Sequence, residues 1–269
     1  LLTNYNNFNL EPQQQRLVKR VRKCPDQDPD FQELLTQLPK YCLQHSTVNE
    51  ENARQFMLIG SIIFPPNAIT ISESAFSWSN RSIFFIMAYN VQIVEQYAFE
   101  KCYNLRKAFF PALKSVQQCG FYCCQQLREF VAPNLEEVGD MAFTQCTNLL
   151  TFKANPLSVG DNAFGSTPMR YMDLSNVEEL GDTAFSESKI AFLNLKNCKE
   201  INFDIDETKR KIFVETGAVL GRRTNCIKVE KVVDPRVKMG EMMEIGGFGD
   251  GYKFLKIKIG NFKKIIVLE

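Results

Sequence analysis

The side chains most able to do chemistry are thiols, because the 269-residue chain has nine cysteines and only one histidine. A catalytic cysteine needs an activated thiolate, commonly beside a histidine, and His45 lies far in sequence from Cys119, Cys123 and Cys124. Zinc sites are typically built from closely spaced ligand pairs, and the chain contains no Cys-x-x-Cys pair. We therefore expect neither a metal site nor a catalytic thiol.

Paired carboxylates are the other candidates for catalysis, as general acid and base. The pairs Glu136-Glu137 and Glu178-Glu179 stand at the same phase of a sequence repeat. Recurrence at a fixed phase is typical of a solvated turn. We predict that the chain is not an enzyme and has no cofactor and no small-molecule substrate.

The repeat is anchored on a small residue followed by phenylalanine, 21 to 23 residues apart in six copies: Ala75-Phe76, Ala98-Phe99, Gly120-Phe121, Ala142-Phe143, Ala163-Phe164 and Ala184-Phe185. An aliphatic residue stands five positions before each phenylalanine. Cysteine stands three positions after it in three consecutive copies, at Cys102, Cys124 and Cys146. A fixed period of this length is the mark of a solenoid, in which each unit stacks on its neighbours.

Within each unit, alternating residues predict a strand of four or five residues whose inward face holds pairs such as Phe130 and Ala132. Glycine–aspartate pairs such as Gly139-Asp140 indicate a turn on the returning side. The phenylalanine then fills the middle of the coil. The repeated cysteines are predicted to form a buried column of reduced thiols, packed as small hydrophobes.

The spelling aliphatic-Gly-Asp-x-Ala-Phe-x-x-Cys-x-x-Leu, seen from Val138 to Leu149, resembles the BspA-type leucine-rich repeat. The resemblance covers residues 60–200. It implies a curved solenoid with strands on its concave side, in a family of interaction and surface proteins. Copies one, five and six depart from it, with Ser79, Thr167 and Ser188 in place of cysteine.

The chain divides into three predicted parts. Residues 1–59 lack the repeat and suggest three short helices, the last introduced by a capping-box spelling at residues 47–50. Residues 60–205 hold the leucine-rich repeat solenoid, with a partial seventh unit. Residues 206–269 form a β-rich cap or module, with strands over 211–214 and 227–233 and a hairpin joining 253–259 to 262–268 through Gly260-Asn261.

The glycine-rich run 246–251 is interpreted as a flexible turn, because it lacks the Lys-Ser/Thr of a phosphate-binding loop. The predicted fold class is therefore a mostly β repeat solenoid with a helical N-terminal cap and a β-rich C-terminal cap.

Charge is balanced overall but not locally. Residues 60–206 carry 11 basic and 16 acidic residues, and residues 207–269 carry 14 and 8. The basic tail either docks onto the acidic repeats or binds an acidic partner. The five cations between Arg16 and Lys23 are either a solvated helix face or a contact to nucleic acid or a membrane surface.

The repeat phase predicts which residues face outward from the strands. Nine of them are candidate partner-binding residues: Phe64, Phe85, Met87, Lys107, Phe109, Val131, Lys153, Tyr171 and Asp173. Among these, Phe85, Met87, Phe109 and Val131 form a predicted apolar patch of the kind that marks interaction sites. The alternative is that the N-terminal helices or the tail cover the patch.

The leading hypothesis is a scaffold that holds a protein partner on its strand-lined concave face. The alternative is a structural protein of the cell surface, such as an adhesin. A third hypothesis is binding of nucleic acid or ribonucleoprotein through residues 16–23 and the basic tail. No apolar run of 18 residues predicts a membrane span, and no signal peptide is evident at residue 1. With unpaired thiols this predicts a cytoplasmic protein, unless a signal peptide was trimmed, in which case a cell-surface location is expected.

Overall fold

A computed structural model describes most of the chain. The described residues are 45–58, 61–64, 67–78, 83–201, 212–216, 219–220, 226–229, 243–247, 253–259 and 262–268. Residues 1–44, where the first two of the three short helices were expected, lie outside these ranges.

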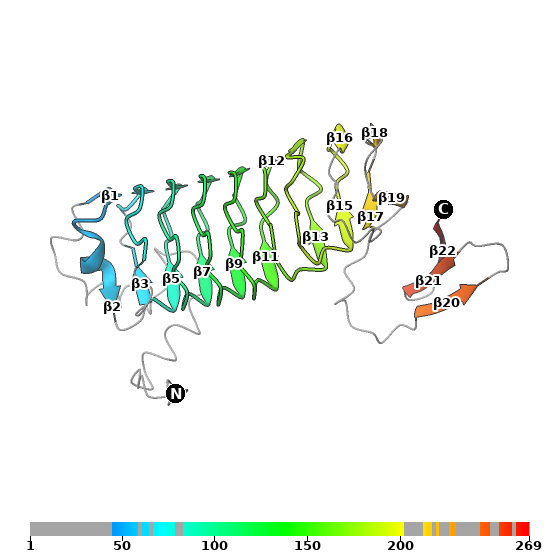
Figure 1. The fold of residues 1–269 in the computed structure, drawn as a ribbon, viewed down its shortest axis with the longest axis horizontal. Helices are drawn as coiled ribbons and strands as arrows, with labels where there is room; N and C mark the ends of the chain where they lie inside the picture. Colours follow the sequence, from blue (N-terminus) through cyan, green and yellow to red (C-terminus); the bar gives the residue numbers. More distant parts are fainter. Residues whose placement is uncertain are drawn as a thin grey trace, which may run out of the picture.

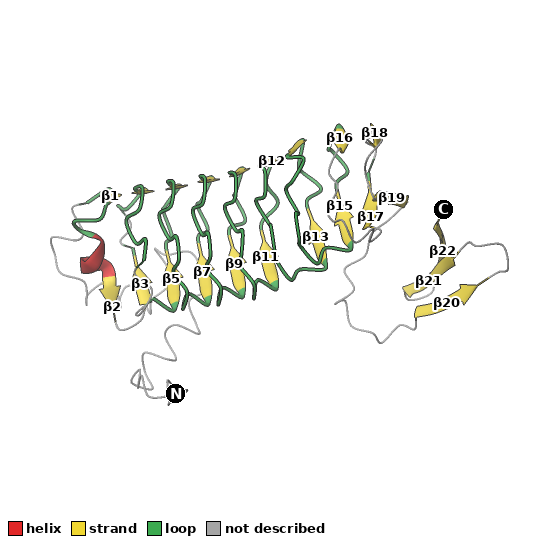
Figure 2. Cartoon of the chain, viewed as in Figure 1, coloured by secondary structure: helices red, strands yellow, loops and turns green. Residues whose placement is uncertain are grey.

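The repeats form a β-solenoid in which each coil contributes one strand to a front sheet and one to a back sheet (Figures 1 and 2). The front strands run along the lower side of Figure 1 and the back strands along its upper side. The first front sheet contains β2 (Met57–Leu58), β3 (Ser61–Ile63), β5 (Phe85–Met87), β7 (Lys107–Phe109), β9 (Glu129–Val131) and β11 (Thr151–Lys153). The back sheet contains β1 (Thr47–Val48), β4 (Thr70–Ile71), β6 (Ile93–Val94), β8 (Ser115–Val116), β10 (Glu137–Val138), β12 (Ser158–Val159) and β14 (Glu179–Leu180). Apart from β2 with β3, these pairs are parallel, as successive coils of one hand require.

The predicted phenylalanine anchors stack along the axis of the solenoid and form its core. From Phe76 to Phe185 their ring centroids lie 5.0–5.7 Å apart, with interplanar angles of 12° or less. A second column, from Phe110 to Phe152, meets them edge-on. All six anchors are buried, which confirms the sequence assignment of the core.

Each anchor sits in a tight turn stabilised by the neighbouring coils. Residues two positions before and two positions after the anchor adopt a positive φ in most coils, as at Cys119 and Cys123 around Phe121. This left-handed conformation is costly for non-glycine residues. Backbone hydrogen bonds to the next coil hold it in place, for example Cys119 N–H to Asp140 O at 2.9 Å.

The N-terminal end of the described chain differs from the expected helical cap. Thr47–Val48 is strand β1, which pairs in parallel with β4 and so begins the back sheet. A capping box does exist, but two residues later, where Asn49 and Asn52 exchange backbone-to-side-chain hydrogen bonds of 2.9 and 3.1 Å. It leads into one 3-10 turn, η3 (Ala53–Phe56). Val48 is fully buried at the aliphatic position of the repeat, and we attribute the strand to this packing.

The solenoid continues beyond the sixth anchor without an Ala-Phe turn. A second front sheet contains β13 (Tyr171–Asp173), β15 (Phe192–Asn194), β17 (Ile212–Glu215) and β19 (Cys226–Val229), all paired in parallel. On the back, β16 (Glu200–Ile201) pairs with β18 (Val219–Leu220). Strand pairing thus extends past residue 205, where the repeats were expected to end.

The C-terminal hairpin is present as predicted. β21 (Lys253–Ile259) and β22 (Phe262–Leu268) are antiparallel, with Ile259 opposite Phe262. β20 (Met243–Gly247) adds a third strand. Gly246 and Gly247 are therefore strand residues, and residues 248–251 of the expected flexible turn lie outside the described ranges.

The front of the solenoid is interrupted between β11 and β13, a place that we call the seam. These strands belong to different sheets, although β12 and β14 pair across the same two coils at the back. The loop before β13 is one residue short: Met169 follows Phe164 by five positions, whereas Leu149 follows Phe143 by six. Because of the shorter loop, β13 begins one residue closer to its anchor than β11 does. The backbone groups of the two strands are therefore not aligned, and the two strands do not pair.

Candidate functional site

The candidate site is the outward side of β5, β7, β9, β11, β13, β15 and β17, together with the residue before each of the first six of these strands. We call it the strand-lined face. Parallel pairing sets its residues side by side in rows. Met87 aligns with Phe109, Phe109 with Val131 and Val131 with Lys153. Beyond the seam Tyr171 aligns with Phe192, and Phe192 with Phe213.

Two of the nine expected site residues are not on this surface. Phe64 is fully buried. Ile63 of β3 aligns with Met87, so Phe64 stands one position further, at the level of the inward Ala88. The outward phase of Phe64 was assigned by its distance from the Phe76 anchor. The assignment was wrong because the first unit has one more residue between its front strand and its anchor than the second unit has. Met87 keeps its outward register but is only 6% exposed, so it is unavailable as a contact.

The remaining seven are at least partly accessible. Phe85, Phe109, Val131 and Tyr171 are half-buried, and Lys107, Lys153 and Asp173 are exposed. The ring of Phe109 is held edge-on by Tyr89, with centroids 5.6 Å apart. With Met87 buried, the apolar patch is smaller than expected.

The carboxylate of Glu129 lies between Lys107 and Lys153 and forms an ion pair with each. Glu129 Oε2 lies 3.2 Å from Lys107 Nζ, and Glu129 Oε1 lies 2.9 Å from Lys153 Nζ. The hydrogen bond from Lys153, assisted by that from Lys107, lowers the pKa of Glu129 below its usual value. Glu129 thus stays ionised and neutralises part of the charge of both lysines.

Sequence reasoning missed Phe213. It is half-buried on β17 and stacks on Phe192, with ring centroids 5.3 Å apart. Its unit has no Ala-Phe anchor from which to count. The alternation of the buried Ile212 and Val214 around it was the available signal.

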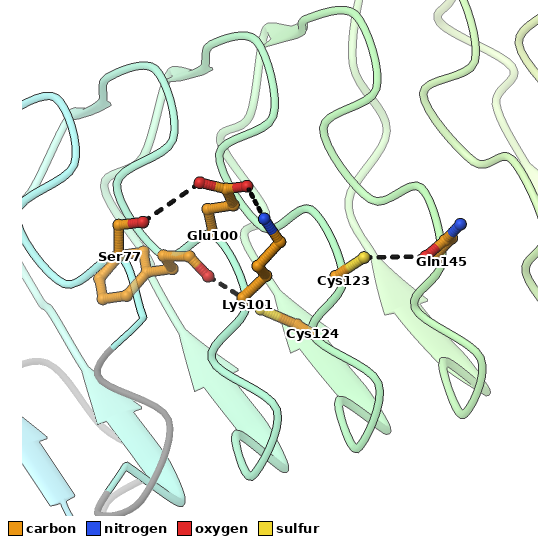
Figure 3. Close-up of polar contacts among 7 residues, drawn as sticks. Ser77, Glu100, Lys101, Cys123, Cys124 and Gln145 are labelled. Carbon is orange, nitrogen blue, oxygen red and sulfur yellow. Dashed lines mark hydrogen bonds and ion pairs between the residues drawn. The ribbon is translucent and has the colours of Figure 1, made fainter.

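A second polar cluster lies on the edge of the solenoid formed by the anchor turns (Figure 3). Glu100 accepts a hydrogen bond from Ser77 at 3.2 Å and contacts Lys101 Nζ at 2.8 Å. Lys101 Nζ also lies 4.0 Å from the ring centroid of the exposed Trp78. Cys123 Sγ donates to Gln145 Oε1 at 2.9 Å. These contacts tie neighbouring coils together.

Four thiols of the described chain are poor nucleophiles. Six cysteines are free and buried. Burial raises the pKa of Cys119 and Cys123, and of Cys124 and Cys146, so all four are protonated at neutral pH. Within the described residues no three His, Cys, Asp or Glu side chains are placed to hold a metal ion. Absence of enzyme activity and a cytoplasmic location both stay predictions.

No helix in the described part of the chain is long and apolar enough to cross a membrane. A family model described as "BspA type Leucine rich repeat region (6 copies)" matches residues 46–150, 69–191 and 112–212. Among solved structures, the crystal structure of a leucine rich cell surface protein from Faecalibacterium prausnitzii A2-165 is similar, with 13% identity and a TM-score of 0.44. That match covers 65% of this chain and 60% of the other. No curated protein matches the chain.

Proposed function

Because the chain belongs to the BspA-type leucine-rich repeat family, we propose that it is a non-enzymatic scaffold that binds a protein partner on its strand-lined face. One observation carries the proposal. Six large apolar side chains, one on each of six front strands, point outward and are half-buried: Phe85, Phe109, Val131, Tyr171, Phe192 and Phe213.

This composition is unusual for a strand face that meets only water, where polar side chains alternate with buried ones. Aromatic side chains offer large contact area with few rotatable bonds, and interface energy concentrates in a few such anchors. Their placement on successive front strands to either side of β11 suits a partner that lies across several strands.

The proposal is tested by selecting peptides from a displayed random library on the intact chain, followed by affinity measurements on variants. We expect Phe109→Ser to weaken the binding free energy of the selected peptides by on the order of 2 kcal/mol. Leu157→Ser, which alters a 47% exposed apolar side chain beside the back strand β12, is the matched control and should leave binding unchanged.

Thermal melts of both variants decide whether the Phe109 ring is surface or core. A folded Phe109→Ser variant that has lost the peptides supports the proposal. Peptides that bind this variant as tightly as the wild type would contradict it. So would unfolding of the variant, because Phe109 would then be covered by the chain itself.

A further inference from the structure

The two broad faces of the solenoid carry opposite charge. On the strand-lined face, the strands β5 to β15 and the residue before each contain five basic residues and two acidic residues, a net charge of +3. On the back, the strands β4 to β14 with one preceding and two following residues contain nine acidic residues and one basic residue, a net charge of −8. The strand-lined face is therefore a basic surface on an acidic repeat array.

Part of the basic surface is already paired. Lys107 and Lys153 share Glu129, as described above. Asp173 accepts hydrogen bonds from the Asn194 amide at 3.0 Å and the Ser175 N–H at 3.2 Å. The lysines and both acidic residues thus have partners within the chain.

The three arginines of this surface differ from its two lysines. Arg106, Arg128 and Arg170 are exposed, and each stands immediately before a front strand, β7, β9 and β13 respectively. Within the described chain none of the three forms a salt bridge. Arg106 lies over the ring of Phe84 at 5.4 Å. Arg106 and Arg128 stand before neighbouring strands, whose backbones lie ~4.8 Å apart, so two like charges lie on adjacent coils.

We propose that the strand-lined face binds an extended acidic segment of a protein, whose carboxylates meet Arg106, Arg128 and Arg170 and whose apolar side chains meet Phe109 and Val131. The inference rests on the proposed function and specifies the chemistry of its partner. Guanidinium groups present a planar pair of donors that matches a carboxylate. Phe109 and Val131 lie on β7 and β9, the strands that Arg106 and Arg128 immediately precede, so one chain crossing β7 and β9 meets both kinds of group.

An acidic protein segment fits better than a nucleic acid. A phosphodiester backbone brings one charge per nucleotide, whereas the face presents half-buried apolar side chains between its cations. The net charge of −8 on the back sheet also opposes the approach of a long polyanion.

The test uses the full chain and a fluorescent peptide of about 12 residues in which glutamate alternates with leucine and phenylalanine, long enough to cross the front strands. Fluorescence anisotropy should show binding that weakens as NaCl rises from about 50 to about 300 mM. The triple variant Arg106→Gln/Arg128→Gln/Arg170→Gln should weaken it by on the order of tenfold or more. The double variant Lys114→Gln/Lys199→Gln, which removes cations paired with Glu136 and Glu178 outside this face, should not.

Three results would overturn the inference: equal binding of a peptide with lysine in place of glutamate, no effect of the triple variant, or tighter binding of a single-stranded oligothymidine of similar length. Self-association in sedimentation that the triple variant abolishes would also overturn it, since the occupant would then be a second copy. In another outcome, the library peptides bind in a way that depends on Phe109, yet are non-acidic and bind the triple variant as tightly as the wild type. This result would overturn the inference and leave the proposed function intact. Failure of all library peptides to depend on Phe109 would overturn the proposed function.

Discussion

At the scale of single residues, the repeated cysteines act as hydrogen-bond donors inside the core. Cys102 Sγ donates to Phe76 O at 3.3 Å, Cys124 Sγ to Phe99 O at 3.2 Å and Cys146 Sγ to Phe121 O at 3.3 Å. Each thiol thus links its coil to a carbonyl of the preceding coil, and Phe99 O and Phe121 O also accept the backbone N–H of Cys102 and Cys124. Cysteine suits the position because it is small, packs as a hydrophobe and carries one weak donor.

Alkaline pH should destabilise the protein through these thiols. Burial raises the pKa of Cys124 and Cys146, while in the unfolded chain they ionise near about pH 8.5. Their contribution is complete below that pH and is lost as pH rises, because the unfolded state then releases protons that the folded state retains. Urea unfolding between about pH 8 and about pH 9.5 should show a smaller loss of stability for Cys124→Ala/Cys146→Ala than for the wild type. Equal slopes would contradict burial of the thiols.

At the scale of elements, the seam shows how a one-residue change in a loop affects a whole strand pair. The N–H groups of Ala132 and Leu174 donate to the next coil, to Lys153 O at 3.0 Å and to Asn194 O at 2.9 Å. Ala154 has the same position in its coil, but its N–H makes no corresponding bond to Asp173 among the described residues. The side chains of Phe152 and Ala154 are also only partly buried, unlike most inward residues of the other front strands.

The amide of Ala154 should therefore exchange with solvent faster than those of Ala132 and Leu174. Native-state hydrogen exchange followed by NMR measures the three amides in one experiment. Faster exchange at Ala154 alone is the expected result. Equal protection of all three amides would mean that the front ladder is continuous across the seam in solution.

At the scale of the whole molecule, the phenylalanine rings connect the coils into one core. Phe143 contacts four other rings, at centroid distances from 4.8 to 5.6 Å, in its own and in neighbouring coils. A solenoid is stabilised by interfaces between adjacent units. Loss of one central ring therefore weakens two interfaces at once.

Phe143→Ala should lower the free energy of unfolding by roughly 3–5 kcal/mol. Phe192→Ala, at a half-buried outward position, serves as the matched control and should cost clearly less. Urea melts of both variants and the wild type give the comparison. An effect of Phe143→Ala no larger than that of Phe192→Ala would refute the assignment of the anchors to the core.

The sequence alone determined the features that recur from one unit to the next. The anchors, the aliphatic positions, the cysteine column and the outward phase of Phe85, Phe109 and Val131 follow from residue periodicity within one unit. The hairpin at Gly260-Asn261 was equally predictable, because a two-residue turn fixes its own register.

Only the tertiary structure decided what depends on the alignment of unequal units. It placed Phe64 in the core, made Thr47–Val48 a back strand, opened the seam before β13 and brought Arg106, Arg128 and Arg170 to one face. The physical reason is that the sequence of a single unit determines which of its residues alternate between inward and outward. The register between two coils, in contrast, is set by how the coils pack against each other. One added or deleted loop residue changes that register without changing the local pattern.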